Sequence, residues 1–394
     1  KNKNPNVPNL RFNNDPYKKY NLYEFATRVT RKNKDNVSNL PLTISAQYGL
    51  VDQVSFFNKT VASKDMSGYY LLKNGEFAYN KSYSNDYPWG AIKRLDLYDM
   101  GCLSTLYICF KTNDNIVNSN YLVHYFESSK WHKQVADIAG EGARNHGLLN
   151  IGVNDFFNTK HAVPTIENQI KIAGFLDLIE KRIQTQIKII GDYNSLKKGI
   201  IQHIFNVNYE FPNVHLKAVL KEISQKNKNR DNIDVLSVSN SLGFIKQSEQ
   251  FEDREIASAD TSNYKIVNKN EYAYNPARIN VGSIARLQSC DCGIVSPMYT
   301  VFKTDISKIS YEYFDLFLQS STFQKQLNQK LEGSVRQCLT FASMQNILIE
   351  LPPLEMQIEI SEKMKFIDSK IKIESDYLNL LKTEKEYLLK NMFV

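Results

Sequence analysis

The chain contains two copies of one unit, and this duplication limits the folds it can adopt. The copies share three short motifs in the same order: Glu-x-Gln-Ile at 167–170 and 355–358, Ala-Tyr-Asn at 78–80 and 273–275, and Phe-Lys-Thr at 110–112 and 302–304. A repeat of this length is unlike the short periods of solenoids and propellers, so it predicts two similar domains. Two similar domains can present two similar surfaces, which suits a ligand with two parts.

Composition sets broad limits on the partners and on the compartment. The 394 residues carry a formal net charge of +7, which permits a polyanionic partner. Lysine and arginine are spread over both halves and mixed with acids, so folded surfaces would have to bind any polyanion. The sequence has no signal-peptide pattern and no apolar stretch of membrane-spanning length, so we expect a cytoplasmic protein. Its five cysteines are scattered without zinc-ligand spacing and predict reduced thiols.

Each half begins with short runs of β-branched and aromatic residues, broken by Gly, Asn and Asp, over about residues 40–110 and 233–302. This pattern is typical of strands joined by loops. Each half then has one amphipathic helical segment with matched apolar positions. These positions are Tyr121, Leu122, Tyr125 and Phe126 in the first copy and Tyr313, Phe314, Phe317 and Leu318 in the second. The sequence therefore predicts two similar α+β units.

A long heptad pattern follows each globular unit. It runs from Leu176 to Ile204 and, in identical register, from Met364 to Met392. Neither helix can bury such a stripe alone, so we predict that the two pair as a coiled coil. A parallel pair would place Lys197 against Lys385, whereas an antiparallel pair places Lys197 within a turn of Glu374. We therefore predict an antiparallel pair.

The predicted order is a globular unit at 1–162, a spacer helix at 163–207, a second globular unit at 208–350 and a second spacer helix at 351–394. The antiparallel helices would separate the two units and relate them by a pseudo-twofold axis. The 39 residues from position 167 to 205 would form a rod about 58 Å long. Such a rod matches recognition elements set roughly one to two turns of B-DNA apart.

Sequence signatures of common enzymes are absent. The chain has no phosphate-binding loop, no dinucleotide-binding glycine motif, and no zinc-protease or serine-hydrolase motif. Asn-Asp-Tyr-Pro at 85–88 superficially resembles the Asn/Asp-Pro-Pro-aromatic motif of amino-methyltransferases, but it lacks consecutive prolines and a glycine-rich cofactor turn. We predict a noncatalytic protein with no catalytic, cofactor-binding or metal-binding residues, and keep a methyltransferase or nuclease as the enzyme alternative.

Several motifs of the second copy resemble one protein family. Leu-Pro-Pro-Leu-Glu-Met-Gln at 351–357 leads into the terminal helix, after Ala-Tyr-Asn-Pro-Ala-Arg-Ile-Asn-Val-Gly-Ser-Ile at 273–284 and Gly-Ile-Val-Ser-Pro at 293–297. With the duplicated plan, these motifs resemble the specificity subunit of type I DNA restriction-modification systems over essentially the whole chain. The first copy has one proline, at position 164, and lacks the Asn-Pro-Ala-Arg form at 80–83.

This resemblance implies two target recognition domains, 1–162 and 208–350, each reading one half of a split DNA sequence. The two helices would act as spacer and as docking surface for two modification subunits, which would bind S-adenosylmethionine and methylate adenine. Restriction subunits that use ATP and Mg²⁺ for translocation and cleavage would join the same complex. Two further readings remain open, a two-headed protein scaffold and an RNA-binding protein.

Arginines that match between the copies are candidates for contacts that both halves share. Arg94 pairs with Arg286, and Arg144 pairs with Arg336, each at an offset of 192 positions. Every duplex has the same phosphate backbone, so we predict that these four arginines position it. The alternative for each is a salt bridge within the fold or a docking contact.

Loop residues that differ between the copies are the candidates for reading bases, because base edges carry the sequence information. In the first copy they are Ser45, Gln47, Lys81, Tyr83 and Trp89; in the second they are Ser239, Ser241, Arg278 and Asn280. Unlike loops predict unlike half-sites and hence an asymmetric bipartite target. The alternative is structural, with the aromatic residues packing beneath a loop and the serines capping turns.

Overall fold

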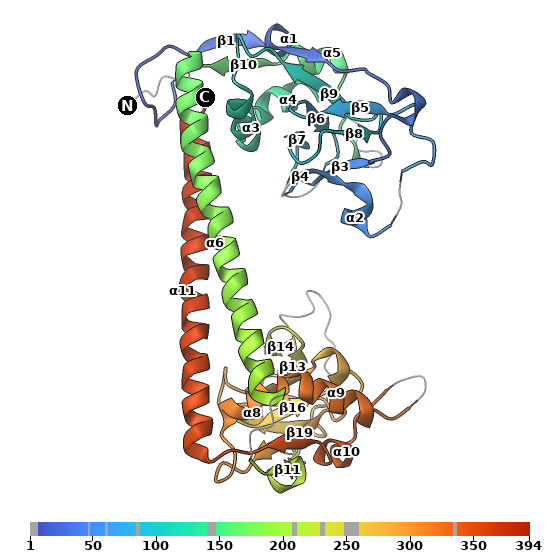
Figure 1. Cartoon of the computed structure of the whole chain (residues 1–394), viewed down its shortest axis with the longest axis vertical. Coiled ribbons are helices and arrows are strands. Elements are labelled where there is room, and N and C mark those ends of the chain that lie inside the picture. The colour runs from blue at the N-terminus through green and yellow to red at the C-terminus, as the bar shows by residue number, and fades with distance from the viewer. Residues whose placement is uncertain are drawn as a thin grey trace. The chain divides into compact units, whose positions relative to one another are not determined.

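The computed structural model describes residues 7–45, 48–59, 62–83, 87–139, 147–206, 211–228, 233–247, 260–333 and 337–394. The chain divides into two compact units. Unit 1 comprises Lys1–Ile187 with Asp376–Val394, and unit 2 comprises Lys188–Ser375. Two long helices, α6 (Ile166–Asn206) and α11 (Leu354–Met392), each contribute one part to each unit (Figure 1).

Unit 1 is built around a four-stranded antiparallel sheet of order β2-β9-β6-β7. The pairs β3-β4, β5-β8 and β1-β10 complete its strands. Besides its parts of α6 and α11, its elements are β1 (Lys18–Asn21), α1 (Leu22–Phe25), β2 (Ala26–Arg28), the 3-10 helix η1 (Lys34–Asn36), β3 (Leu42–Ser45), β4 (Gly49–Asp52), α2 (Gln53–Phe57), β5 (Tyr70–Lys73), β6 (Phe77–Asn80), β7 (Ala91–Arg94), β8 (Met100–Leu103), β9 (Ile108–Thr112), α3 (Ser119–Glu127), α4 (His132–Ile138), α5 (Val153–Phe157) and β10 (Lys160–Val163).

Unit 2 repeats this plan. Its four-stranded sheet has the order β12-β19-β16-β17, and its strand pairs are β13-β14, β15-β18 and β11-β20. The elements are β11 (Asn213–His215), the 3-10 helix η3 (Leu216–Ala218), β12 (Leu220–Ile223), β13 (Leu236–Ser239), β14 (Gly243–Lys246), β15 (Lys265–Asn268), β16 (Tyr272–Tyr274), the 3-10 helix η4 (Ile279–Val281), β17 (Ile284–Arg286), β18 (Cys292–Val295), β19 (Thr300–Thr304), α8 (Tyr311–Leu318), α9 (Ser321–Lys330), α10 (Phe341–Gln345) and β20 (Leu348–Glu350). The predicted pair of similar α+β units is confirmed.

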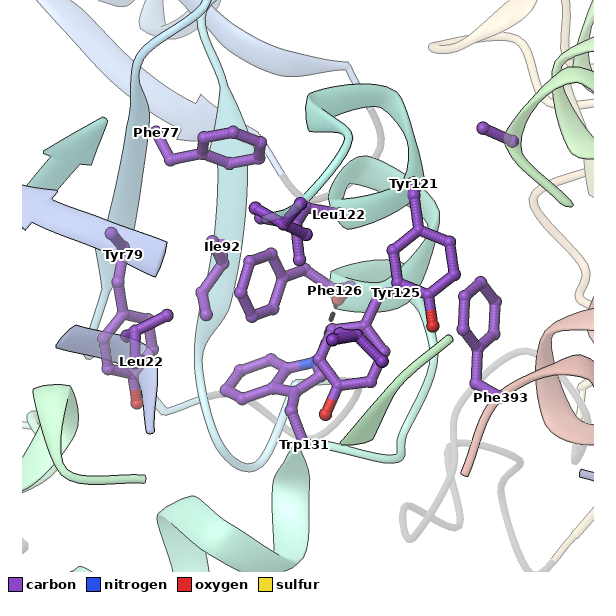
Figure 2. Packing of buried hydrophobic residues seen from close by; sticks show 14 of the residues in the cluster. Leu22, Phe77, Tyr79, Ile92, Tyr121, Leu122, Tyr125, Phe126, Trp131 and Phe393 are labelled. Atoms are coloured by element: carbon purple, nitrogen blue, oxygen red, sulfur yellow. Dashed lines mark hydrogen bonds between the residues drawn. The ribbon is translucent and has the colours of Figure 1, made fainter. Parts of the chain in front are cut away.

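An aromatic core holds unit 1 together, as Figure 2 shows. Phe77 and Phe110 are cross-strand partners in the sheet and stack with ring centroids 5.3 Å apart. The buried indole of Trp131 donates its N–H to the carbonyl of Phe126 at 3.0 Å. Phe393, near the end of the chain, packs against Tyr121 with centroids 5.3 Å apart. The segment after α11 thus belongs to the core of unit 1.

The long helices pair in opposite directions within each unit. In unit 1 the early residues Leu176 and Ile183 of α6 share a buried cluster with the late residue Leu388 of α11. In unit 2 the late residue Phe205 of α6 shares a cluster with the early residue Met364 of α11. The predicted antiparallel pairing is confirmed.

Ion pairs between the helices repeat at the offset of the duplication. Lys385 on α11 bonds Glu180 on α6 at 2.6 Å, and Lys197 on α6 bonds Asp368 on α11 at 2.5 Å. The sequence pointed to Glu374 as the neighbour of Lys197, whereas the carboxylate that its Nζ reaches is that of Asp368. Heptad positions define which faces meet, but they leave the stagger along the axis open.

A buried glutamine attaches each long helix to its own unit. Gln169, which is fully buried, accepts the backbone N–H of Asn118 at 2.7 Å and donates to the carbonyls of Pro164 at 2.8 Å and Ile116 at 3.2 Å. Gln357 makes the same three bonds in unit 2, with Ser310, Pro352 and Lys308. The repeated Gln of the sequence motif therefore has a structural role.

We expect Gln169→Ala to lower the free energy of unfolding of unit 1 by about 1–3 kcal/mol, because it leaves three backbone groups without partners. Both tryptophans of the chain, Trp89 and Trp131, lie in unit 1, so tryptophan fluorescence during urea unfolding reports on this unit. Gln184→Ala is the control, because Gln184 is an exposed residue of the same helix whose amide donates to the side chain of Glu180 one turn earlier. Equal unfolding midpoints for the two variants would contradict the role of Gln169.

All five cysteines are free, and Cys102 and Cys109 are buried. Burial raises the pKa of the Cys109 thiol to about 12, so it stays protonated and unreactive at neutral pH. Within the described residues, no helix has the length and apolarity needed to cross a membrane.

Candidate nucleic-acid interface

Three loops of unit 2 meet at one end of its central sheet. They are the β13-β14 hairpin loop at 239–243, the β16-β17 connection at 275–283 and the β18-β19 turn at 296–299. Ser283 donates its hydroxyl to the carbonyl of Val238 at 2.8 Å, which ties the connection to the hairpin. Asn275 Nδ2 lies 4.0 Å from Met298 Sδ, which places the turn beside the connection. The loops therefore form one continuous edge.

Four of the predicted base-reading residues lie on this edge. Arg278 and Asn280 are exposed on the β16-β17 connection. Ser239 and Ser241 lie in the hairpin, where the Ser239 hydroxyl accepts backbone N–H groups of Ser241 at 3.3 Å and Leu242 at 3.4 Å. Ser239 thus caps the turn, as the structural alternative expected, while its neighbours remain available at the surface.

The predicted residues of unit 1 have more structural contacts. Ser45 is buried and its hydroxyl accepts the N–H of Tyr48 at 3.1 Å, so it caps the equivalent turn. Lys81 donates its ammonium to the carbonyl of Ile151 at 3.3 Å. Tyr83 is exposed, whereas Trp89 packs partly buried against the aromatic core. Gln47 lies outside the described residues, and contact of these residues with bases stays a prediction.

The matched arginines Arg94 and Arg286 both bind groups of their own unit. Arg94 contacts Asp96 at 2.6 Å and the side chain of Asn120 at 2.7 Å. The side chain of Arg286 is only 8% exposed and contacts Asp315 at 2.7 Å. These are the ion pairs that the sequence left open as the alternative to phosphate contacts, which stay a prediction. Arg144 and Arg336 lie outside the described residues.

A cavity of about 490 Å³ adjoins Arg286 in unit 2. Besides Arg286 and Asp315, its polar lining includes Asn240, Gln288 and Gln319. Burial raises the pKa of Asp315, although the Arg286 guanidinium opposes this shift. Asn240 and Gln288 were not among the predicted residues. Gln288 lies two positions beyond Arg286, the last residue of β17, so an extended continuation of the strand would direct both side chains to one face.

The site has the features of a polar binding edge. In the part of the chain that the structure describes, no group of three or more His, Cys, Asp or Glu side chains could hold a metal ion. Hydrogen-bonding side chains lie instead on loops at the end of a rigid sheet, an arrangement common to proteins that recognise other molecules. The fold and the loops together define a recognition module present in two versions.

Comparisons with known proteins show what this module is similar to. The family model for the type I restriction modification DNA specificity domain matches residues 221–383. A chain from a structure of complex assembly and conformational transition of the type I R-M system aligns with 16% identity and a TM-score of 0.58, covering 97% of this chain and 99% of that one. The S subunit of a type I restriction-modification system from M. genitalium aligns with 12% identity and a TM-score of 0.53, covering 98% and 99%. No curated protein matches the sequence.

Residues 221–383 therefore match the type I restriction modification DNA specificity domain, which confirms the resemblance recognised from the sequence. The matched region contains most of unit 2 and much of α11. The two solved structures show that the fold extends over nearly the whole chain.

Proposed function

We propose that this chain is the noncatalytic specificity subunit of a type I restriction-modification complex and that it reads an asymmetric, bipartite DNA target with a fixed gap. Units 1 and 2 would each read one half-site. The observation that carries the proposal is the combination of one sheet plan with two different sets of loop residues. The sheet plan common to both units suits contacts with the phosphate backbone, which is the same in both half-sites. The loops that differ between the units suit contacts with different bases.

The exposed faces of the long helices support docking of partner subunits. Ile170 and Leu178 on α6 are 53% and 62% exposed, and the residues 188 positions later on α11, Ile358 and Phe366, are 50% and 65% exposed. Large apolar side chains at equivalent exposed positions mark a repeated interaction surface. We propose that each of these two apolar pairs, which we call the α6 patch and the α11 patch, docks one modification subunit.

The partner subunits would carry out the chemical reactions of the complex. Modification subunits would bind S-adenosylmethionine and methylate adenine, and restriction subunits would use ATP and Mg²⁺. This chain would supply no cofactor-binding or metal-binding group, and the complex would act in the cytoplasm. Its net charge of +7 suits contact with double-stranded DNA.

Selection from a random duplex library tests the proposal. The complex of this chain with its modification subunit would be incubated with the library, and bound DNA would be sequenced. We expect a gapped motif with two unlike halves and an affinity that falls steeply with salt. Equal binding to all duplexes, or preferential binding of RNA in competition, would contradict DNA sequence recognition and favour a scaffold or an RNA-binding protein.

Arg336→Glu tests the predicted phosphate contact. Loss of one phosphate contact should reduce the slope of log affinity against log salt by about one and weaken binding to all sequences alike. Arg94→Glu, at another of the four predicted phosphate contacts, is the comparison. Arg94 bonds Asp96 and Asn120 within the fold, so this variant shows the effect of changing an arginine that has partners in its own unit. An unchanged affinity and salt slope for Arg336→Glu would remove this residue from the interface.

A further inference from the structure

Each unit exposes a large aliphatic side chain at the tip of the same turn. Leu106, in the β8-β9 turn at 104–107, is 61% exposed, and Met298, in the β18-β19 turn at 296–299, is 63% exposed. The two residues are 192 positions apart, the offset that also relates Arg94 to Arg286. A single exposed apolar residue is ordinary on a protein surface. Its repetition at equivalent turns in units with different loops calls for a shared role.

Hydrogen bonds hold both turns in shape. Ser104 accepts the N–H of Leu106 on its hydroxyl at 3.4 Å and the N–H of Tyr107 on its carbonyl at 3.2 Å. In unit 2 the carbonyl of Ser296 accepts the N–H of Tyr299 at 3.0 Å. Tyr299 is itself buried in the core beneath the hairpin. Each turn therefore presents its tip residue outward on an anchored base.

Both turns lie at the end of the sheet that carries the predicted base-reading loops. In unit 2 the contact of Met298 with Asn275 places the turn next to the connection that contains Arg278 and Asn280. In unit 1 the register pairs Tyr79 with Ile108, so the turn adjoins the connection that begins at residue 81. The aliphatic tips and the polar loops thus belong to the same edge in each unit.

An exposed lysine lies two strands away from the base of each turn. Lys32 bridges to Tyr70, whose strand partner Leu103 immediately precedes the first turn. Lys226 bridges to Lys265, whose strand partner Val295 immediately precedes the second turn. Lys32 donates its ammonium to the carbonyl of Gly68 at 2.8 Å, and Lys226 donates to the side chain of Asn263 at 3.3 Å. Lysine ammonium groups contact phosphates without regard to sequence, so each loop edge has a cation in its vicinity that suits the DNA backbone.

We propose that Leu106 and Met298 are specificity-determining wedges, one for each half-site, that insert their side chains against the base stack and partly unstack one step. This inference rests on the proposed function, because it requires that the loop edge faces DNA. Leu and Met are among the apolar residues that act as wedges in the minor groove, where they kink the duplex. The cost of unstacking depends on the step, so a wedge selects deformable steps without hydrogen bonds to bases.

The chain offers matched controls at the opposite end of each sheet. Leu97 has the same residue type and the same 61% exposure as Leu106, but it follows β7 at the far end of that strand. Ile306 is 60% exposed and follows β19, whereas Met298 precedes it. All four side chains are exposed, so their replacement by alanine should leave the fold intact.

The test uses the full chain in complex with its modification subunit and a duplex carrying the selected motif, with 2-aminopurine placed at successive steps of each half-site. Apart from the target adenine, which a methyltransferase flips out of the stack, we expect fluorescence to rise at one further step in each half-site when the complex binds. Met298→Ala should abolish the rise in the half-site read by unit 2 and weaken binding roughly tenfold, and Leu106→Ala should do so in the other. Met298→Leu should retain both properties, and Leu97→Ala and Ile306→Ala should match the parent.

The possible failures are distinguishable. If the parent complex selects a gapped motif but Met298→Ala and Leu106→Ala bind and unstack DNA as it does, the wedges are disproved and the proposed function stands. If the parent complex shows no duplex preference, the proposed function fails and the wedges fail with it.

Discussion

Lys385→Met is expected to destabilise unit 1 by about 3–5 kcal/mol, the largest effect of a single substitution that we predict for stability. Lys385 lies between two carboxylates, with its Nζ 2.6 Å from Glu180 and 3.0 Å from Glu127. Its side chain is 17% exposed and that of Glu127 is 24% exposed. Methionine keeps most of the volume but removes the cation that lies between the two carboxylates, and Lys93, 3.5 Å from Glu127, neutralises only one of them. Losing such a largely buried cation is much more costly than losing an exposed pair.

Lys197→Met is the matched control, because Lys197 occupies the equivalent position in the repeat. Its partner Asp368 is 51% exposed, so this pair should contribute about 1 kcal/mol or less. Far-ultraviolet circular dichroism during urea unfolding, which reports on the helices and strands of both units, should therefore show a large shift for Lys385→Met and almost none for Lys197→Met, whose site lies in unit 2. Equal shifts would contradict the different burial of the two pairs.

Acid should reduce the difference between Lys385→Met and the parent. Burial alone would raise the pKa of Glu127, but the His124 ring nitrogen 3.7 Å away and the charges of Lys385 and Lys93 hold this pKa well below its usual range. A depressed folded-state pKa contributes stability above the unfolded pKa of about 4.3 and loses it as pH falls further. We expect the difference in unfolding free energy to be full at pH 6–7 and to shrink as pH decreases below about 4. A difference that stays constant over this range would contradict the ionic origin.

Placing a charge in both apolar patches is expected to abolish assembly. Leu178→Glu should weaken docking at the α6 patch, and Phe366→Glu should weaken docking at the α11 patch, each by at least about a hundredfold if the residue is an interface anchor. Each single variant should therefore retain one modification subunit and the double variant none. Mass photometry of the purified complexes measures this stoichiometry directly.

Leu97→Glu is the control for a new charge at an equally exposed apolar site away from the long helices, and it should leave the stoichiometry unchanged. Tryptophan unfolding would show that unit 1 remains folded in Leu178→Glu. If the double variant still bound two modification subunits, the docking surface would have to lie elsewhere on the chain.

Local patterns predicted the elements of this fold well. The duplicated motifs predicted two similar units, and the apolar positions of α3, such as Tyr121 and Tyr125, are buried as helical spacing required. The antiparallel pairing followed from avoiding like charges, Lys197 against Lys385. These features depend on periodicity and on charge sign, both of which are visible in a sequence.

Sequence patterns did not predict the contacts between segments that are far apart in the sequence. Glu127 reaches Lys385 from α3, and Arg286 on β17 finds Asp315 on α8. Neither pairing has a signal in residue spacing, because each depends on how a helix is placed against a sheet or a second helix. For the same reason, sequence alone predicted Arg286 at the DNA backbone, while the structure shows its guanidinium among carboxylates.

Sequence patterns also could not identify the two residues proposed as wedges. Leu106 and Met298 belong to apolar residue types that are usually buried, and only their exposure in the structure distinguishes them from core residues. Once the turn positions were known, the offset of the duplication related one to the other. Base identity remains a property of loop geometry and DNA shape, which the residue types do not encode.

Methylation profiling tests the central claim most directly. This chain and its modification subunit would be expressed in a host without DNA methylation, and the DNA would be read by long-read sequencing. We predict adenine methylation at a gapped, asymmetric motif that disappears when this chain is omitted. A palindromic motif would contradict two unlike half-sites, and an absence of any motif while the two proteins co-purify would contradict the role of this chain in reading DNA sequence.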